Sequence, residues 1–197
     1  MKVLKTILAL FISFTVTAQA VQDITYFDIP TDQVGEFIQT HKKFMDVTMN
    51  EERKVQGQWV YRHFYGSGAS VAVFTDFANI NDAVNDDPWA SLRSKWQSSN
   101  EDERKELEAL GQKYASFLVN HSDDIRSSNF ENNFVGKENV DWDTPFILVV
   151  GNYNVNKPNA SIAGNAFMEW RTKPGVEKGL QLGGGYTTHF SGSGPDL

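Results

Sequence analysis

The sequence predicts an α+β protein made of two tandem βαββαβ units, of which the second is incomplete. Two observations support this prediction. The hexapeptide His-Phe-x-Gly-Ser-Gly occurs at 63–68 and again at 189–194, which lies 126 residues further along the chain. Around the first hexapeptide, the expected helices and strands follow one another in the order of such a unit. A motif repeated together with its flanking elements indicates an internal duplication.

Residues 1–20 have the features of an export signal peptide. Lys2 and Lys5 give a positively charged start, and 7–16 is an apolar run too short to span a bilayer. The small residues of Ala18-Gln19-Ala20 offer a cleavage site, and a cut two residues earlier is the alternative. We therefore expect export to the periplasm or the medium, and no association with a membrane after the signal is removed.

The composition limits the classes of partner. The chain has a net charge of −7, which argues against nucleic acid and anionic lipid, because phosphate groups bind to basic clusters. It contains no cysteine, so it has neither a disulfide framework nor a thiol nucleophile. No motif in the sequence predicts a cofactor or a metal.

The first unit is expected over 21–121. A strand is predicted at 24–29, where β-branched and aromatic residues precede Pro30. Thr31 is the expected N-cap of a helix over 32–50, because apolar residues recur there at intervals of three and four.

Two further strands are predicted at 59–65 and 69–77, joined through Gly66-Ser67-Gly68 as a hairpin. A helical segment over 79–97 is interrupted at Asp87-Pro88.

The next helix is expected to open with a capping box formed by Asn100 and Glu103, and its apolar stripe runs to His121. Residues 122–144 are polar and rich in asparagine. We interpret them as a connecting segment with at most one short edge strand near 130–135.

The second unit is expected over 145–197, with a strand at 146–155, a helix at 162–170 and a strand at 180–190. A shift of 126 residues places Phe27 on Tyr153 and Gly57 on Gly183. Leu197 then corresponds to Val71, so the returning strand of this unit has no sequence. We expect either a longer product or pairing with another element, because exposed strand edges are normally covered.

The order of elements is that of the ferredoxin-like split βαβ unit. In its topology the chain resembles the dimeric α/β-barrel superfamily, whose members include antibiotic-biosynthesis-monooxygenase-like and EthD-like proteins. The resemblance covers 24–121 and 146–197 and includes no diagnostic motif. It implies a cavity between two sheets for a small, often aromatic ligand, and a homodimer as a further expectation. No catalytic motif is matched, so the resemblance assigns no residue a role.

Strand alternation places Trp59, Tyr61, His63 and Tyr65 on one face of the predicted strand. We expect this face, with His189 as the counterpart of His63, to bind the ligand. Either histidine could instead transfer a proton, or be a packed core residue with one hydrogen-bonded ring nitrogen.

The register of the hairpin decides which of these applies to His63. A three-residue loop sets His63 opposite Val71, and a two-residue loop sets it opposite Ala72. Arg62, on the other face, is expected to pair with Asp28 if it is buried.

The remaining histidines, His41 and His121, fall on apolar helix stripes and are expected to be packed and hydrogen-bonded. His121 with Asp123 and Asp124 lacks a second histidine or a cysteine, so it does not predict a metal site.

The function expected from the sequence is therefore binding of a small apolar or aromatic ligand in a cleft between sheets. The alternative is a cofactor-independent oxygenase or isomerase in which His63 or His189 transfers a proton.

Overall fold

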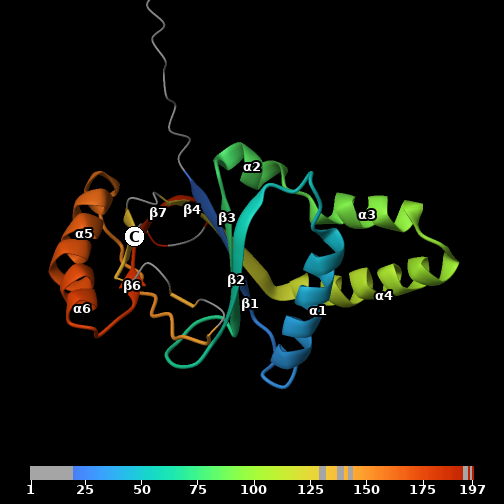
Figure 1. Cartoon of the computed structure of the whole chain (residues 1–197), viewed down its shortest axis with the longest axis horizontal. Coiled ribbons are helices and arrows are strands. Elements are labelled where there is room, and N and C mark those ends of the chain that lie inside the picture. Colours follow the sequence, from blue (N-terminus) through green and yellow to red (C-terminus); the bar gives the residue numbers. More distant parts are fainter. Residues whose placement is uncertain (1–19, 129–131, 137–139, 142–143, 193–194, 196) are drawn as a thin grey trace, which may run out of the picture.

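The computed structural model describes residues 20–128, 132–136, 140–141, 144–192, 195 and 197. All but the last residue of the predicted signal peptide lies outside the described residues. The larger elements are five strands and six helices in an α+β arrangement (Figure 1): β1 (Val21–Phe27), α1 (Val34–Thr48), β2 (Val55–Arg62), β3 (Val71–Phe77), α2 (Ile80–Asn85), α3 (Pro88–Ser98), α4 (Glu101–Phe117), β4 (His121–Ser128), α5 (Ala160–Phe167), α6 (Lys173–Glu177) and β7 (Thr187–Gly192). The two-residue strands β5 (Phe134–Val135) and β6 (Gly183–Gly184) pair with each other.

The main sheet has the strand order β2-β3-β1-β4-β7, and every neighbouring pair is antiparallel. Its first four strands, with α1 and α4 as the crossovers, form a ferredoxin-like βαββαβ unit. Helices α1, α3 and α4 lie on one side of this sheet, whereas α5 and α6 lie on the other (Figure 1). The predicted α+β, ferredoxin-like fold class is therefore confirmed.

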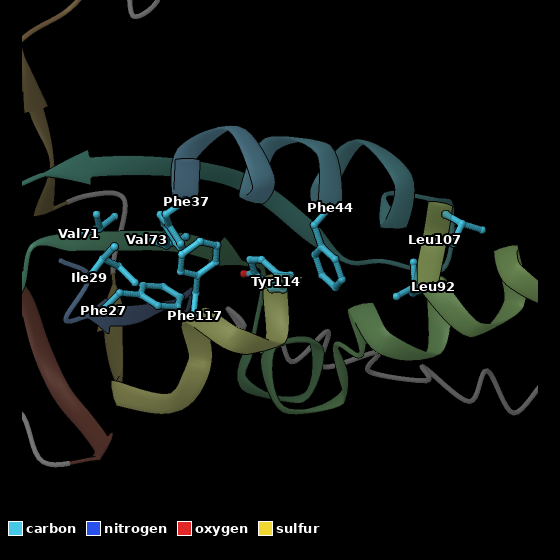
Figure 2. Close-up of a cluster of buried hydrophobic side chains, with 10 residues drawn as sticks. All are labelled: Phe27, Ile29, Phe37, Phe44, Val71, Val73, Leu92, Leu107, Tyr114 and Phe117. Atoms are coloured by element: carbon cyan, nitrogen blue, oxygen red, sulfur yellow. The ribbon is translucent and has the colours of Figure 1, made fainter. Parts of the chain in front are cut away.

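The core lies between the sheet and helices α1, α3 and α4 (Figure 2). Phe37 and Phe44 project from α1 and are completely buried. The ring of Phe44 stacks on that of Tyr114 from α4, with 4.1 Å between the ring centres. Aromatic rings bury large apolar areas, so these contacts attach both crossover helices to the same face of the sheet.

The helix starts follow the sequence signals with one exception. Asn100 and Glu103 form the predicted capping box, and Asp87 caps α3 with Pro88 in its first turn. Thr31 is not an N-cap, because α1 begins later, after Gln33, and has no side-chain cap.

Residues 122–144 are not merely a connecting segment. β4 occupies His121–Ser128 and pairs with β1 on one side and β7 on the other. The prediction was wrong here because β4 has a single apolar residue after its histidine, Ile125, so the alternation of a half-buried strand is missing. The short strand expected near 130–135 forms as β5.

The strand predicted at 146–155 is also wrong. Residues 145–156 contain no strand, and Tyr153 exchanges two backbone hydrogen bonds with Leu197. β-branched residues favour a strand only when a second row of backbone groups is present to bond with it. The predicted helix at 162–170 lies within α5 and the π-helical turn Met168–Thr172 that follows it.

Several local features recur at the predicted spacing of 126 residues. The amide of Gln33 bonds to the carbonyl of Pro30, and that of Asn159 bonds to the carbonyl of Asn156. Helices α1 and α5 begin directly after these turns, and both capping residues have φ −101°.

The first glycine of each repeated hexapeptide has a similar backbone conformation. Gly66 and Gly192 both have positive φ, at 104° and 119°. These matches support the two-unit organisation, while the assignment of 145–197 as a duplicated domain stays a prediction.

Candidate functional site

An open cleft of about 910 Å³ lies at one end of the sheet, between the β1–α1 loop and the β2–β3 loop. Its lining combines aromatic, charged and small residues from both loops and from the start of α1: Asp28, Ile29, Pro30, Thr31, Val34, Arg62, His63, Phe64, Tyr65, Gly66, Gly68 and Ser70. This cleft therefore lies between two loops, whereas the resemblance implied a cavity between two sheets.

Hydrogen bonds near the end of β2 fix the two walls of the cleft. The amide of His63 donates to the carbonyl of Ser70 at 2.8 Å. The hydroxyl of Ser70 accepts from the amide of Ile29 at 2.5 Å and donates to the carbonyl of Phe27 at 3.0 Å. A single serine side chain therefore holds the hairpin against the end of β1.

The loop between β2 and β3 is longer than either expected form. β2 ends at Arg62, which faces Val71, so His63 lies opposite Ser70 and both predicted registers are wrong. Gly66 and Gly68 adopt φ values of 104° and 140°, which glycine tolerates without steric cost. The Gly-Ser-Gly sequence is a turn, as predicted.

The five predicted ligand-binding residues are distributed over three places. His63 and Tyr65 line the cleft, and Tyr65 is almost fully exposed. Trp59 and Tyr61 lie on the face of the sheet opposite to the core and to helices α1 and α4. There the ring of Tyr61 contacts those of Phe74 and Phe146. The expected common face ends at Arg62 because strand alternation ends there.

Arg62 is exposed in the cleft lining, and within the described ranges it forms no ion pair. The expected pair with Asp28 is absent. A water-exposed guanidinium needs no internal partner, since the cost that requires pairing arises only on burial. Arg62 and His63 thus present hydrogen-bond donors to the cleft, and Asp28 presents acceptors.

His189 lies at the opposite edge of the sheet from His63. It is on β7, and three strands separate it from β2. Its Nδ1 is 3.0 Å from Oδ1 of Asp124, which is almost completely buried. The structure does not bring the two histidines together.

Asp124 and Arg126 form a buried ion pair beside His189. Nη1 of Arg126 donates to Oδ2 of Asp124 at 2.8 Å, and its Nε donates to the hydroxyl of Thr187 at 2.6 Å. With Oδ1 of Asp124 accepting the Nδ1 proton of His189, the lone pair of neutral His189 resides on Nε2. A carboxylate that orients an imidazole in this way is a common arrangement for proton transfer.

His41 is packed and hydrogen-bonded, as predicted. The amide nitrogen of Gln58 donates to the hydroxyl of Thr75, so its carbonyl accepts from Nε2 of His41 at 2.9 Å. Nδ1 then accepts from the hydroxyl of Tyr114 at 3.1 Å. Burial lowers the pKa of His41 and raises that of Tyr114 to about 12, so both remain neutral at pH 7.

His121 is half-exposed at the start of β4, where its ring stacks on Phe27 and Nε2 lies 3.4 Å from Asp123. Across the described part of the chain, no group of three histidine or acidic side chains could hold a metal ion. No helix in that part is both long and apolar enough to cross a membrane.

From the sequence, Asp124 was considered only as a metal ligand beside His121 and Arg126 was not considered, because β4 was interpreted as a connecting segment. The order of the predicted elements could have indicated that β4 is a strand. A βαββα sequence needs a closing strand directly after its second helix, and β4 begins within four residues of the end of α4.

No protein-family model matches the chain, and no curated protein matches it. Two solved structures resemble it, with a TM-score of 0.35 each. One is a dimeric protein of unknown function and ferredoxin-like fold from Bacteroides fragilis, 13% identical, with 55% of this chain and 96% of that chain covered. The other is a conserved protein from Methanosarcina mazei Go1, 12% identical, with 57% and 96% covered.

Asp23, on β1, is a partly buried residue whose Oδ1 is covered from solvent and has no hydrogen-bond partner within the described residues. Burial is the main cause that raises the pKa of Asp23 to about 6, and nearby Asp123, Asp124 and Asp86 raise it further. The folded protein therefore holds a proton that the unfolded chain releases near pH 4.

We predict that Asp23→Asn removes this pH dependence. The stability of the wild type should fall as the pH rises from about 4 to about 6, by about 3 kcal/mol for a pKa difference of about 2. The variant should match the wild type below pH 4 and be the more stable of the two at pH 7. Urea unfolding at a series of pH values measures the difference, and a difference independent of pH would contradict the assignment.

Proposed function

We propose that the protein binds a small aromatic carboxylate in the cleft between the β1–α1 and β2–β3 loops. The observation that supports this most strongly is the lining. It presents Arg62, without an ion-pair partner in the described residues, beside His63 and the rings of Phe64 and Tyr65. A guanidinium group matches the geometry of a carboxylate, and aromatic side chains suit an aromatic ring.

The size and polarity of the cleft agree with this ligand class. Its volume of about 910 Å³ falls within the range of small-molecule sites, which is roughly 300–1,000 Å³. Asp28 in the same lining provides an acceptor for a hydroxyl group elsewhere on the ligand. A hydroxylated aromatic acid, such as 4-hydroxybenzoate, is a suitable probe.

We expect Arg62→Gln to weaken binding of 4-hydroxybenzoate about tenfold, since hydrogen bonds to charged groups contribute about 1.5–3 kcal/mol. Binding of 4-hydroxybenzamide, which has no negative charge, should not change. Arg171→Gln removes an exposed arginine outside the cleft and serves as the matched control. Isothermal titration calorimetry checks all four combinations, and an equal loss for both ligands would contradict the role of Arg62.

A second candidate function is proton transfer at His189, in line with the expected cofactor-independent oxygenase or isomerase. It is favoured by the hydrogen bond between His189 and the buried Asp124. That bond orients the ring and leaves Nε2 to accept a proton from a substrate. His63 has no such carboxylate partner within the described residues, so His189 is the stronger of the two predicted proton-transfer residues.

If the protein has this activity, His189→Gln should reduce turnover at least 100-fold, the usual contribution of a general base. His63→Gln should leave turnover within about twofold, because His63 lies at the opposite edge of the sheet. Product formation from a panel of phenols in air-saturated buffer, followed by mass spectrometry, tests both variants. Absence of product with the wild type would exclude this function for the substrates in the panel.

We also propose that residues 1–18 act as an export signal and that the mature chain begins at Gln19. The carbonyl of Ala20 accepts a hydrogen bond from the amide of Ser128 at 2.8 Å, and the side chain of Ala20 is buried. A cut after Ala20 would remove these contacts with the end of β4, whereas a cut after Ala18 keeps them.

Intact-mass measurement of the exported protein should therefore give a chain that starts at Gln19. A mature chain that starts at Val21 would favour the cut after Ala20, and a cell-retained chain with residues 1–18 intact would contradict export. Membership of the antibiotic-biosynthesis-monooxygenase-like or EthD-like group, and assembly into a homodimer, stay predictions.

A further inference from the structure

Residues 147–152 form an apolar segment whose backbone is unpaired. In the portion of the chain that the structure describes, no backbone hydrogen bond involves any of these six residues. Ile147 and Val149 are more than two-thirds exposed, at 71% and 79%. Exposed peptide groups next to β-branched side chains are the features of a strand edge that can accept another strand.

The neighbouring residue Tyr153 shows how such a strand would pair. Its amide donates to the carbonyl of Leu197 at 2.9 Å, and the amide of Leu197 donates to the carbonyl of Tyr153 at 3.0 Å. Two residues that exchange both hydrogen bonds form one complete step of an antiparallel ladder. The ladder at 147–153 thus already contains its first pair.

The first unit contains the same pair within a complete ladder. A shift of 126 residues relates Tyr153 and Leu197 to Phe27 and Val71, which are partners in β1 and β3. From that pair the β1–β3 ladder continues without interruption to Val21 and Phe77. Residues 147–152 occupy the positions that correspond to the rest of β1.

The composition of the segment favours pairing. Residues 145–155 contain no charged side chain, and 146–155 contain no proline. Charged residues and proline are the usual means by which proteins prevent pairing at a strand edge. An occupant with the pattern of β3, VAVFTDF, would place its side chains alternately on the two faces of the extended sheet.

We propose that residues 147–152 are an acceptor site for an extended peptide strand with the β3 pattern. The strand binds antiparallel, in the register that begins at the pair Tyr153 and Leu197. Because hydrogen-bonded pairs recur at every second residue, the amides of Ile147, Val149 and Gly151 point toward the bound strand. The amides of Leu148, Val150 and Asn152 point away from it.

The test supplies the strand in two forms. One is a free peptide with the sequence of residues 71–77, added to the full chain. The other is the full chain with Ala-Val-Phe-Thr-Asp-Phe, a copy of 72–77, attached directly after Leu197. The attached copy has a high effective concentration, so it should occupy the site even if the free peptide binds weakly. Amide hydrogen exchange followed by NMR reads each position separately.

We expect the attached copy to slow exchange at 147, 149 and 151 at least 100-fold, with a smaller effect at 148, 150 and 152. Val149→Pro removes an amide that faces the strand and should abolish the protection. Val150→Pro removes one that faces away, and proline is tolerated at such edge positions, so this matched variant should keep it. Protection of core amides in α1 and α4 verifies that both variants fold.

Three results would overturn the proposal. Exchange at 147, 149 and 151 unaffected by either form of the strand would show that the segment does not accept it. Protection with equal slowing at all six amides would contradict the register. Concentration-dependent protection in the unmodified chain, without added peptide, would show that a second copy of the chain is the occupant instead.

Discussion

The position of β1 between β3 and β4 is the constraint on which the rest of the structure depends. β1 pairs along its full length with both neighbours, so its register assigns each side chain of three strands to one of two faces. Phe27 and Val71 are opposite each other on the face that α1 and α4 cover. A slip by one residue would exchange the two faces, exposing Phe27 and burying Tyr26.

That assignment also separates the two candidate sites. The cleft forms where β1 and β2 end, because the chain leaves the sheet there through the β1–α1 and β2–β3 loops. Ser70 joins these loops through two hydrogen bonds to the end of β1. The pair formed by Asp124 and His189 lies instead within the ladder of β4 and β7, where Arg126 compensates the buried charge. One site is thus open and shaped by loops, whereas the other is largely buried and held by strands.

How far the sequence predicted the structure depended on where the stabilising contacts of each segment lie. The helices α3 and α4 were predictable because their caps, Asp87 and Asn100, act within three residues. The predictions for β4 and for 146–155 were wrong in opposite ways, since a strand was missed at the first and wrongly expected at the second. β4 is polar but is stabilised by two neighbouring strands distant in sequence, whereas 146–155 is apolar but has no neighbouring strand along it among the described residues. For the candidate site, His63 and Tyr65 were found from residue type, whereas Asp124 depended on a strand that was missed.

The repeated hexapeptide shows why local sequence does not determine chemistry. In both copies a strand leads into a glycine with positive φ, at Gly66 and Gly192. The strand of the first copy pairs with β3, and its histidine lies beyond the last ladder residue, exposed to solvent. The strand of the second copy pairs with β4, whose Asp124 approaches Gly192 so closely that a Cβ there would lie 3.1 Å from the Cα of Asp124. The same approach brings Asp124 within hydrogen-bond distance of His189. The neighbouring strand, and not the hexapeptide, therefore determines whether the imidazole faces solvent or a carboxylate.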